Sequence, residues 1–339
     1  MCVPAILAFL KTYPEWRLTV VTKKPFSALF ARIPGVEVFI ADTKNRHKGL
    51  RGLWRLGRDL KALQPTRIAD LHNVLRTRLV RLFLLTSGIP FRRLDKGRAE
   101  KRRLTAARKR NWAPLKSTHQ RYADVFGALG LPFEFSEKDY LPRESWPASM
   151  KALRPPEGWL KIGIAPFAAH LGKCYPEQMI KEVIGLLEKD SDRRLFLFGG
   201  GSAESERLAS WESQCVHCIS VAGKGSLSEE LALISNLDLM VSMDSGNGHL
   251  AAMYGVPVIT LWGVTHPYSG FAPFGQPESH ALLADRQKFP LIPTSVYGKK
   301  VPPGYEKAME TIPPERVYGL IQEILAGIQA RTTGESDRK

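Results

Sequence analysis

The second half of the chain alternates short apolar segments with amphipathic ones, and this pattern constrains the fold more than any other feature. Strands that are apolar on both sides need cover on both faces of a sheet, and parallel strands need helical crossovers. The sequence therefore predicts an α/β fold with a parallel sheet between two layers of helices. The predicted strands are Leu160–Ala165, Leu195–Phe198, Cys218–Val221, Leu239–Ser242 and Val256–Leu261, and the predicted helices are Glu177–Leu187, Glu204–Trp211, Leu227–Ile234, Gly248–Tyr254 and Pro314–Ala330.

The first half shows the same alternation with weaker contrast. Residues 96–116 are strongly basic with few apolar positions, so we expect an exposed loop there. Elsewhere the periodicity predicts strands at Leu18–Thr22, Val36–Ile40, Arg67–Leu71 and Phe91–Leu94, and helices at Pro4–Tyr13, Leu50–Leu63, Thr77–Thr86 and His119–Leu129.

A proline-rich stretch separates the two halves. Pro142 to Pro156 contains four prolines and no regular period, which predicts a linker. The length of 339 residues suits two domains. We expect a basic domain over residues 1–146, a linker over 147–158, a second domain over 159–330 and a polar tail over 331–339.

Composition excludes several classes of protein. No run of 18 apolar residues predicts a membrane-spanning helix, and the N-terminus lacks the pattern of a secretory signal. Four cysteines do not make a disulfide framework. Cys215-Val-His-Cys218 lacks a second pair of ligands at usable spacing, so the sequence favours an ordinary thiol pair, no metal site and a reducing cytoplasm.

The positive charge is confined to one segment. Residues 44–121 hold 23 Lys/Arg against 4 Asp/Glu, a net charge of +19, whereas the whole chain carries +16. A segment with such an excess attracts polyanions. Anionic lipid with a phosphorylated acceptor, nucleic acid and a simply solvated basic face are the three alternatives. The cluster from Arg92 to Arg110 is not interleaved with aromatic residues, which argues against nucleic acid.

Polar side chains follow the predicted strands of the second half. Ligands of open α/β sheets bind at the carboxyl ends of the strands, so these residues are candidates for one site. Lys173 offers a charge for phosphate, and Glu204 follows a glycine run that lacks the full dinucleotide fingerprint. Asp244 to His249 opens a helix whose first N–H groups favour an anion. Thr265-His-Pro267 ends the fifth strand.

Each of these features also has an ordinary structural explanation. Lys173 suits a surface loop, Glu204 suits a helix start, Asp244 to His249 suits a capped helix with a structural histidine, and Pro267 suits a fixed turn. Together the four loops predict a site for a phosphate-bearing, nucleotide-type ligand. The histidines and carboxylates do not fall in metal-ligand pairs on one helix.

Three consecutive motifs carry a resemblance to a known family. Met243-Asp-Ser-Gly-Asn-Gly-His-Leu-Ala-Ala252, Gly255-Val-Pro-Val-Ile259 and Leu261-Trp-Gly-Val-Thr-His-Pro267 resemble glycosyltransferase family 9, the heptosyltransferases of lipopolysaccharide core assembly. Lys173-Cys-Tyr-Pro176 and the loop from Gly199 to Glu206 fit the family more loosely. The resemblance covers nearly the whole chain and is strongest over residues 160–270.

The resemblance implies a GT-B fold, with two Rossmann-like domains facing a cleft. It also implies inverting transfer of a heptose-like sugar from an ADP-sugar, without metal or cofactor, onto an anionic glycolipid at the cytosolic surface of the inner membrane. By position, the donor-side residues are Lys173, Glu204, Gly225, Asp244, Ser245, Gly246 and His249. The acceptor-side residues are Asp70, Asn73, Arg76, His119 and Arg121. Another nucleotide sugar, or an inactive sugar-nucleotide or nucleic-acid binder, is the alternative.

The N-terminus departs from the family pattern. Met1-Cys-Val-Pro-Ala-Ile6 resembles the segment that follows the family's first strand and its loop with the catalytic aspartate. We therefore expect that strand, and the general base, to lie upstream of Met1. A start assigned too far downstream and an inactive remnant are the two explanations, and the upstream reading frame distinguishes them.

Overall fold

The chain folds into two compact units. The computed structural model describes residues 1–108, 110–136 and 139–336. The N-terminal unit comprises Met1–Arg98 and Lys116–Leu141, and the C-terminal unit comprises Ala99–Leu115 and Pro142–Lys339. The chain therefore enters the C-terminal unit early, returns, and enters it again.

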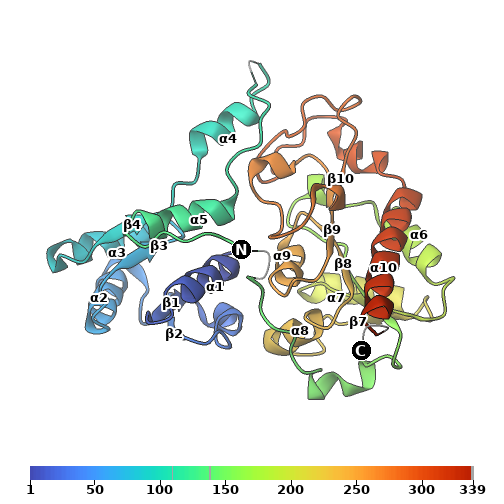
Figure 1. Ribbon diagram of the computed structural model, residues 1–339. Helices are drawn as coiled ribbons and strands as arrows, with labels where there is room; N and C mark the ends of the chain where they lie inside the picture. The colour runs from blue at the N-terminus through green and yellow to red at the C-terminus, as the bar shows by residue number, and fades with distance from the viewer. Residues whose placement is uncertain (109, 137–138, 337–339) are drawn as a thin grey trace. The chain divides into compact units, whose positions relative to one another are not determined.

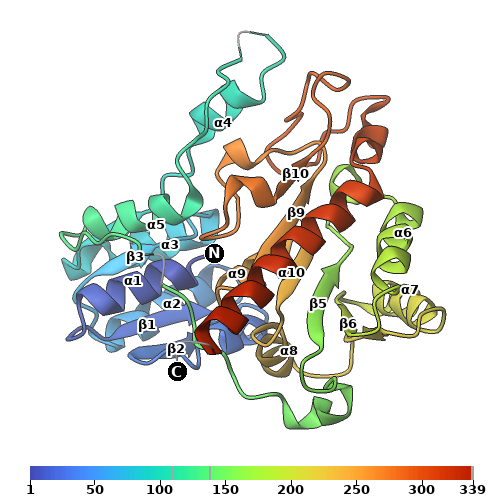
Figure 2. The same ribbon diagram turned by 45° about the vertical axis from the view of Figure 1, so that its right-hand side comes forward.

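A parallel sheet forms the centre of the C-terminal unit (Figures 1 and 2). Within the described residues it has six strands in the order β10-β9-β8-β5-β6-β7. Their bounds are β5 Leu160–Ala165, β6 Arg193–Leu197, β7 Cys218–Ser220, β8 Leu239–Met243, β9 Val258–Trp262 and β10 Ala281–Leu283. Five of them confirm the predicted strands to within two residues, whereas the sequence analysis missed β10.

Helices cover both faces of this sheet because its strands are apolar on both sides. Every residue of β8 and β9 is buried. One face packs against α6 (Glu177–Leu187), α7 (Ser202–Glu212) and α10 (Pro314–Ser336), and Figure 2 shows α10 crossing in front of the strands. The other face packs against α8 (Leu227–Ile234) and α9 (Gly246–Ala252).

The N-terminal unit has helices on both sides of two small sheets. β1 (Leu18–Thr22) pairs in parallel with β2 (Val36–Ile40), and β3 (Ile68–Asp70) pairs in parallel with β4 (Phe91–Arg93). Helices α1 (Val3–Thr12) and α5 (Thr118–Gly127) share one cluster with Leu18 and Ala69. Helices α2 (Gly49–Ala62) and α3 (Leu75–Leu84) share another with Phe39 and Ile68.

The two small sheets thus share the same covering helices without pairing with each other. In the part of the chain that the structure describes, no strand joins β1 to β3. β1 is also half-exposed, with Val21 at 43% exposure, unlike the buried strands of the other unit.

Three expectations need correction. The basic segment is not all loop, because α4 spans Arg98–Leu104 and buries Lys101 and Leu104. Its alanine, lysine and arginine residues are good helix formers. The sequence analysis missed the helix because two buried positions are too few to give a periodic apolar pattern. The predicted linker contains a short helix, η3 (Ala148–Leu153), whose Met150 is buried against the sheet. The polar tail is helical as far as Ser336.

No helix in the described ranges is both long and apolar enough to span a membrane.

Candidate functional site

The strand order creates a reversal point beside β5. The chain proceeds from β5 to β6 on one side, and later places β8 on the other side. The connections after β5 and β8 therefore diverge, and such a point is where open α/β sheets bind their ligands. Lys173 ends the short helix η4 (Leu171–Lys173) after β5, and Asp244 immediately follows β8.

Lys173 and Asp244 form an ion pair across this point. Lys173 Nζ lies 2.7 Å from Asp244 Oδ2 and donates to the Asp244 carbonyl oxygen at 3.1 Å. The two side chains are only 14% and 8% exposed. Thr265 Oγ1 donates to the same Oδ2 at 2.9 Å. Gly298, at φ +75°, lies against the aliphatic part of Lys173. The ammonium group is therefore held in one place at the end of the sheet.

The turn into α9 follows directly. Ser242, at the end of β8, accepts from Gly248 N at 3.2 Å. Ser245 is the N-cap residue in extended conformation, and its side chain does not cap the helix. The first N–H groups of a helix have no intrahelical acceptor, so the start of α9 at Gly246 is a favourable place for negative charge. His249, the fourth residue of α9, is half-buried.

Glu204 and Gly225 lie after β6 and β7, as predicted from the sequence. Glu204 Oε2 accepts from Gly200 N at 2.8 Å, so one carboxylate oxygen closes the glycine turn before α7. Gly225 is exposed, and a Cβ there would collide with the terminal methyl of Met150. In the part of the chain that the structure describes, neither residue forms a hydrogen bond or ion pair with Lys173 or Asp244.

A cluster of rings at the end of β9 is a feature that sequence analysis missed. His266 is 4% exposed, and its Nδ1 accepts from Tyr268 N at 3.2 Å. The Trp112 ring lies 4.8 Å from His266 and 4.9 Å from Tyr268, and the Arg286 guanidinium lies 3.4 Å from the centre of the Trp112 ring. Burial, and secondarily Arg286, lowers the pKa of His266 to about 4. His266 is therefore neutral at pH 7.

Contacts of Arg110 and Lys101, in addition to those of Trp112, fix the basic segment of residues 96–116 on the C-terminal unit. The Arg110 guanidinium donates to the carbonyl oxygens of Leu291 and Ile292 at 2.9 and 2.8 Å. Lys101 Nζ lies 4.1 Å from the centre of the Phe271 ring. Lys101 and Arg110 are thus used internally. The exposed cations of residues 96–116, within the part of the chain that the structure describes, are Arg98, Arg102, Arg103, Arg108 and Lys116. Lys109 lies outside the described residues.

The predicted acceptor-side residues have mixed surroundings in the N-terminal unit. Asn73 Nδ2 donates to Leu94 O at 2.7 Å, and Arg121 lies under Gly97 with its Nε donating to Lys116 O at 3.2 Å. Both side chains therefore support local structure. His119 is buried and Arg76 is exposed.

Asp70 combines a structural contact with a free oxygen. Its Oδ1 accepts from His72 N and Asn73 N, at 3.0 and 2.8 Å. Its Oδ2 is buried and has no hydrogen-bond partner within the described part of the chain. Asp70 is thus the strongest binding candidate of this set.

Comparison with known proteins agrees with this geometry. The family model of glycosyltransferase family 9 (heptosyltransferase) matches residues 53–292, more than half of the chain. The chain belongs to this family. The lipopolysaccharide core heptosyltransferase OpsX of Haemophilus influenzae is 24% identical over 267 residues, which cover 75% of this chain and 72% of that protein.

Solved structures of family 9 enzymes share the fold. A Veillonella parvula family 9 glycosyltransferase has a TM-score of 0.70 and 19% identity, covering 96% of this chain and 93% of that one. The Escherichia coli heptosyltransferase WaaC with ADP has a TM-score of 0.67 and 18% identity, covering 95% and 94%. The predicted family and the α/β GT-B fold class are confirmed, and the chain is a glycosyltransferase.

The ion pair gives a first prediction for this family 9 glycosyltransferase. Replacing Lys173 by Met keeps the aliphatic contact with Gly298 but leaves the buried Asp244 carboxylate without its cation. We expect the free energy of unfolding to fall by about 3 kcal/mol in urea denaturation. The double variant Lys173→Met/Asp244→Asn removes both charges and should regain most of that loss. Equal stability of the single variant and the parent would contradict the pair's role.

The buried histidine gives a second prediction. Because the pKa of His266 is about 4 in the folded chain and near 6.5 when unfolded, the unfolded state binds more protons between these values. The contribution of His266 to the free energy of unfolding is therefore fully present above pH 6.5. The free energy of unfolding should decrease by about 3 kcal/mol as the pH falls to 4. In His266→Asn, whose amide oxygen can accept from Tyr268 N, this decrease should be smaller. Thermal unfolding against pH measures it, with His170→Asn as control; an unchanged slope in His266→Asn would refute the assignment.

Proposed function

We propose that this chain transfers a heptose-like sugar from an ADP-sugar to a lipopolysaccharide-type acceptor, with inversion and without a metal ion. The observation that carries the proposal is the Lys173–Asp244 pair, 2.7 Å apart, at the reversal point of the sheet. The family supports the sugar class. The relatives support the partners: one was solved with ADP, and another is a lipopolysaccharide core enzyme.

The chemistry places a positive charge where negative charge develops. An acceptor hydroxyl attacks the anomeric carbon from the face opposite the diphosphate, the bond to the β-phosphate oxygen breaks, and ADP leaves with the electron pair. Lys173, held by Asp244, whose carboxylate also accepts from Thr265 Oγ1, stabilises the charge on the departing diphosphate. In metal-dependent phosphate chemistry a bound cation supplies this stabilisation. The hydroxyl proton passes to a base that we do not assign to a described residue.

The remaining donor-side residues receive roles by position. Ser245, Gly246 and His249 surround the start of α9, where backbone N–H groups favour the diphosphate and the sugar. Glu204 binds Gly200 N through Oε2, and we assign its other oxygen to a ribose hydroxyl. Gly225 lies on the exposed loop after β7, where we place the adenine.

We assign the acceptor to the basic and polar residues described above. Arg102, Arg103 and Arg108 are exposed on a segment that Arg110 and Lys101 fix in place, which suits phosphate groups of an anionic glycolipid. In the N-terminal unit, Asp70 Oδ2 is buried and has no hydrogen-bond partner within the described residues, and we assign it to an acceptor-side hydroxyl. This assignment implies a cytoplasmic enzyme that acts at the surface of the inner membrane.

Nucleotide binding tests the donor assignment. ADP should raise the melting temperature of the parent chain more than UDP or GDP does. The double variant Lys173→Met/Asp244→Asn should bind ADP at least tenfold more weakly, because it lacks the charge-assisted contact. Its own melting temperature serves as the folding control. Stabilisation by UDP but not ADP would overturn the donor, and full ADP affinity in the double variant would overturn the role of Lys173.

Vesicle co-sedimentation tests the acceptor surface. The parent should bind anionic phospholipid vesicles more than neutral ones. The difference should shrink several-fold when three exposed cations of the segment are removed, because each contributes about 1 kcal/mol near an anionic surface. The test variant is Arg102→Gln/Arg103→Gln/Arg108→Gln, and the charge-matched control, taken from other exposed positions, is Lys189→Gln/Lys307→Gln/Arg316→Gln. Equal loss in both triple variants would contradict a specific surface, and equal binding to both vesicle types would contradict membrane attraction.

A further inference from the structure

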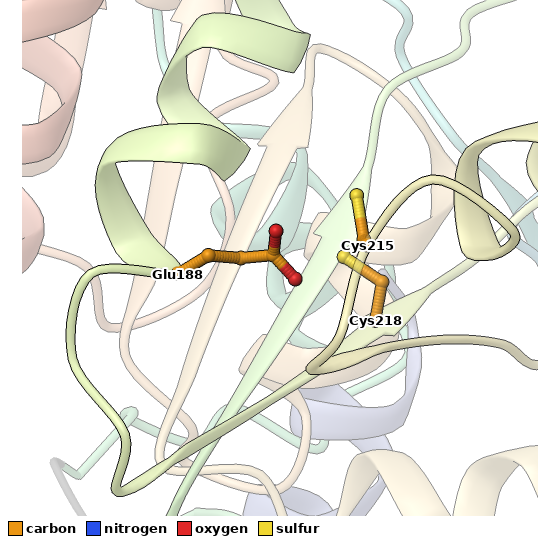
Figure 3. A group of neighbouring side chains, drawn as sticks. All are labelled: Glu188, Cys215 and Cys218. Atoms are coloured by element: carbon orange, nitrogen blue, oxygen red, sulfur yellow. The ribbon is translucent and has the colours of Figure 1, made fainter.

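Three potential metal ligands converge at the amino ends of the strands, on the edge of the sheet opposite Lys173. Figure 3 shows Glu188 directed toward Cys215 and Cys218. Glu188 is the C-cap residue of α6, Cys215 precedes β7, and Cys218 is the first residue of β7. One carboxylate oxygen and both sulfur atoms lie within 4.8 Å of one another.

The three groups face one another, since one carboxylate oxygen and both sulfurs share a single small volume. The Glu188 carboxylate is oriented by His217 N, which donates to Oε1 at 2.9 Å. The His217 ring instead packs edge-on against Trp159, with centroids 5.5 Å apart, so the imidazole is not part of the group.

The spacing of the three atoms suits a tetrahedral centre. With zinc–sulfur bonds of about 2.3 Å, two sulfurs on one zinc ion are about 3.8 Å apart. The observed spread of 4.8 Å at most is therefore close to ligand geometry before any ion is bound. Cys218 is 4% exposed, and Cys215 and Glu188 are half-buried, which leaves one side open to solvent.

We propose that Cys215, Cys218 and Glu188 bind one zinc ion, with a water molecule as the fourth ligand. Both thiols release their protons to solvent on binding, and no redox change occurs. The two thiolates and the carboxylate then face one divalent cation, which leaves a charge of −1. Lys181 lies close enough to influence Cys215 and partly offsets that charge. The site joins the end of α6 to the start of β7 and so stabilises the edge of the sheet.

Burial explains why the thiols need a cation to ionise. It raises the pKa of Cys218 well above its usual range and also raises that of Cys215. A disulfide between the two cysteines would involve the sulfurs alone and would not engage Glu188, whose carboxylate faces them. The sequence analysis left this motif as an ordinary pair because Glu188 is distant in sequence.

Cobalt substitution of the full chain tests the site. The reduced, chelator-treated protein should take up one Co²⁺ per chain and show a thiolate-to-cobalt absorption band, which Zn²⁺ then removes. Cys215→Ser should abolish the band, and Glu188→Gln, which keeps the acceptor for His217 N, should weaken cobalt binding at least tenfold. Cys2→Ser, in the N-terminal unit, should bind cobalt as the parent does.

Thermal unfolding keeps the test independent of the spectrum. Zn²⁺ should raise the melting temperature of the parent and of Cys2→Ser, and should not raise that of Cys215→Ser. The absence of both the band and the thermal shift in the reduced parent would overturn the proposal. Loss of two free thiols on air oxidation, with no metal uptake by the reduced form, would assign the pair to a disulfide instead.

Discussion

The ion pair between Lys173 and Asp244 is the interaction on which the functional edge of the C-terminal unit depends. Each residue follows one of two adjacent strands, so the pair links the connections that diverge at the reversal point. Neither charge could remain at this level of burial alone, because an isolated buried ion loses its hydration without compensation. Thr265 adds a third strand end to the same carboxylate. The site is therefore assembled by the sheet itself.

Fully buried strands were the most predictable part of the fold. Every residue of β8 and β9 is buried, and their runs of five residues are apolar except for Ser242 and Thr260. Their short length favours strands over helices, and the lack of alternation distinguishes them from half-exposed strands. β10 escaped prediction because it is three residues long and, within the described residues, pairs with β9 alone. Helix α4 escaped because its stability comes from helix-forming residues and the cation–π contact of Lys101, not from an apolar stripe.

The candidate site was predictable from the sequence only where its residues follow parallel strands. Lys173 and Asp244 were found because polar residues at strand ends converge in parallel sheets. The edge-on contact of Trp112 with His266 joins segments far apart in sequence, and neither has a periodic pattern that points to the other. The same limitation hid Glu188 beside the Cys215–Cys218 pair. Arg121, proposed from the resemblance, supports the backbone around Gly97.

The discontinuous organisation of the chain has a consequence for its modularity. The polypeptide passes between the units three times, at residues 98–99, 115–116 and 141–142, whereas the sequence predicted a single crossing. A fragment starting at Pro142 would lack Trp112 and Arg110, leaving Arg286 without its ring and the carbonyls of Leu291 and Ile292 without their donor. The two units therefore cannot be exchanged with those of a related enzyme by a single crossover. Recombination that preserves both cores must carry residues 99–115 together with the C-terminal half.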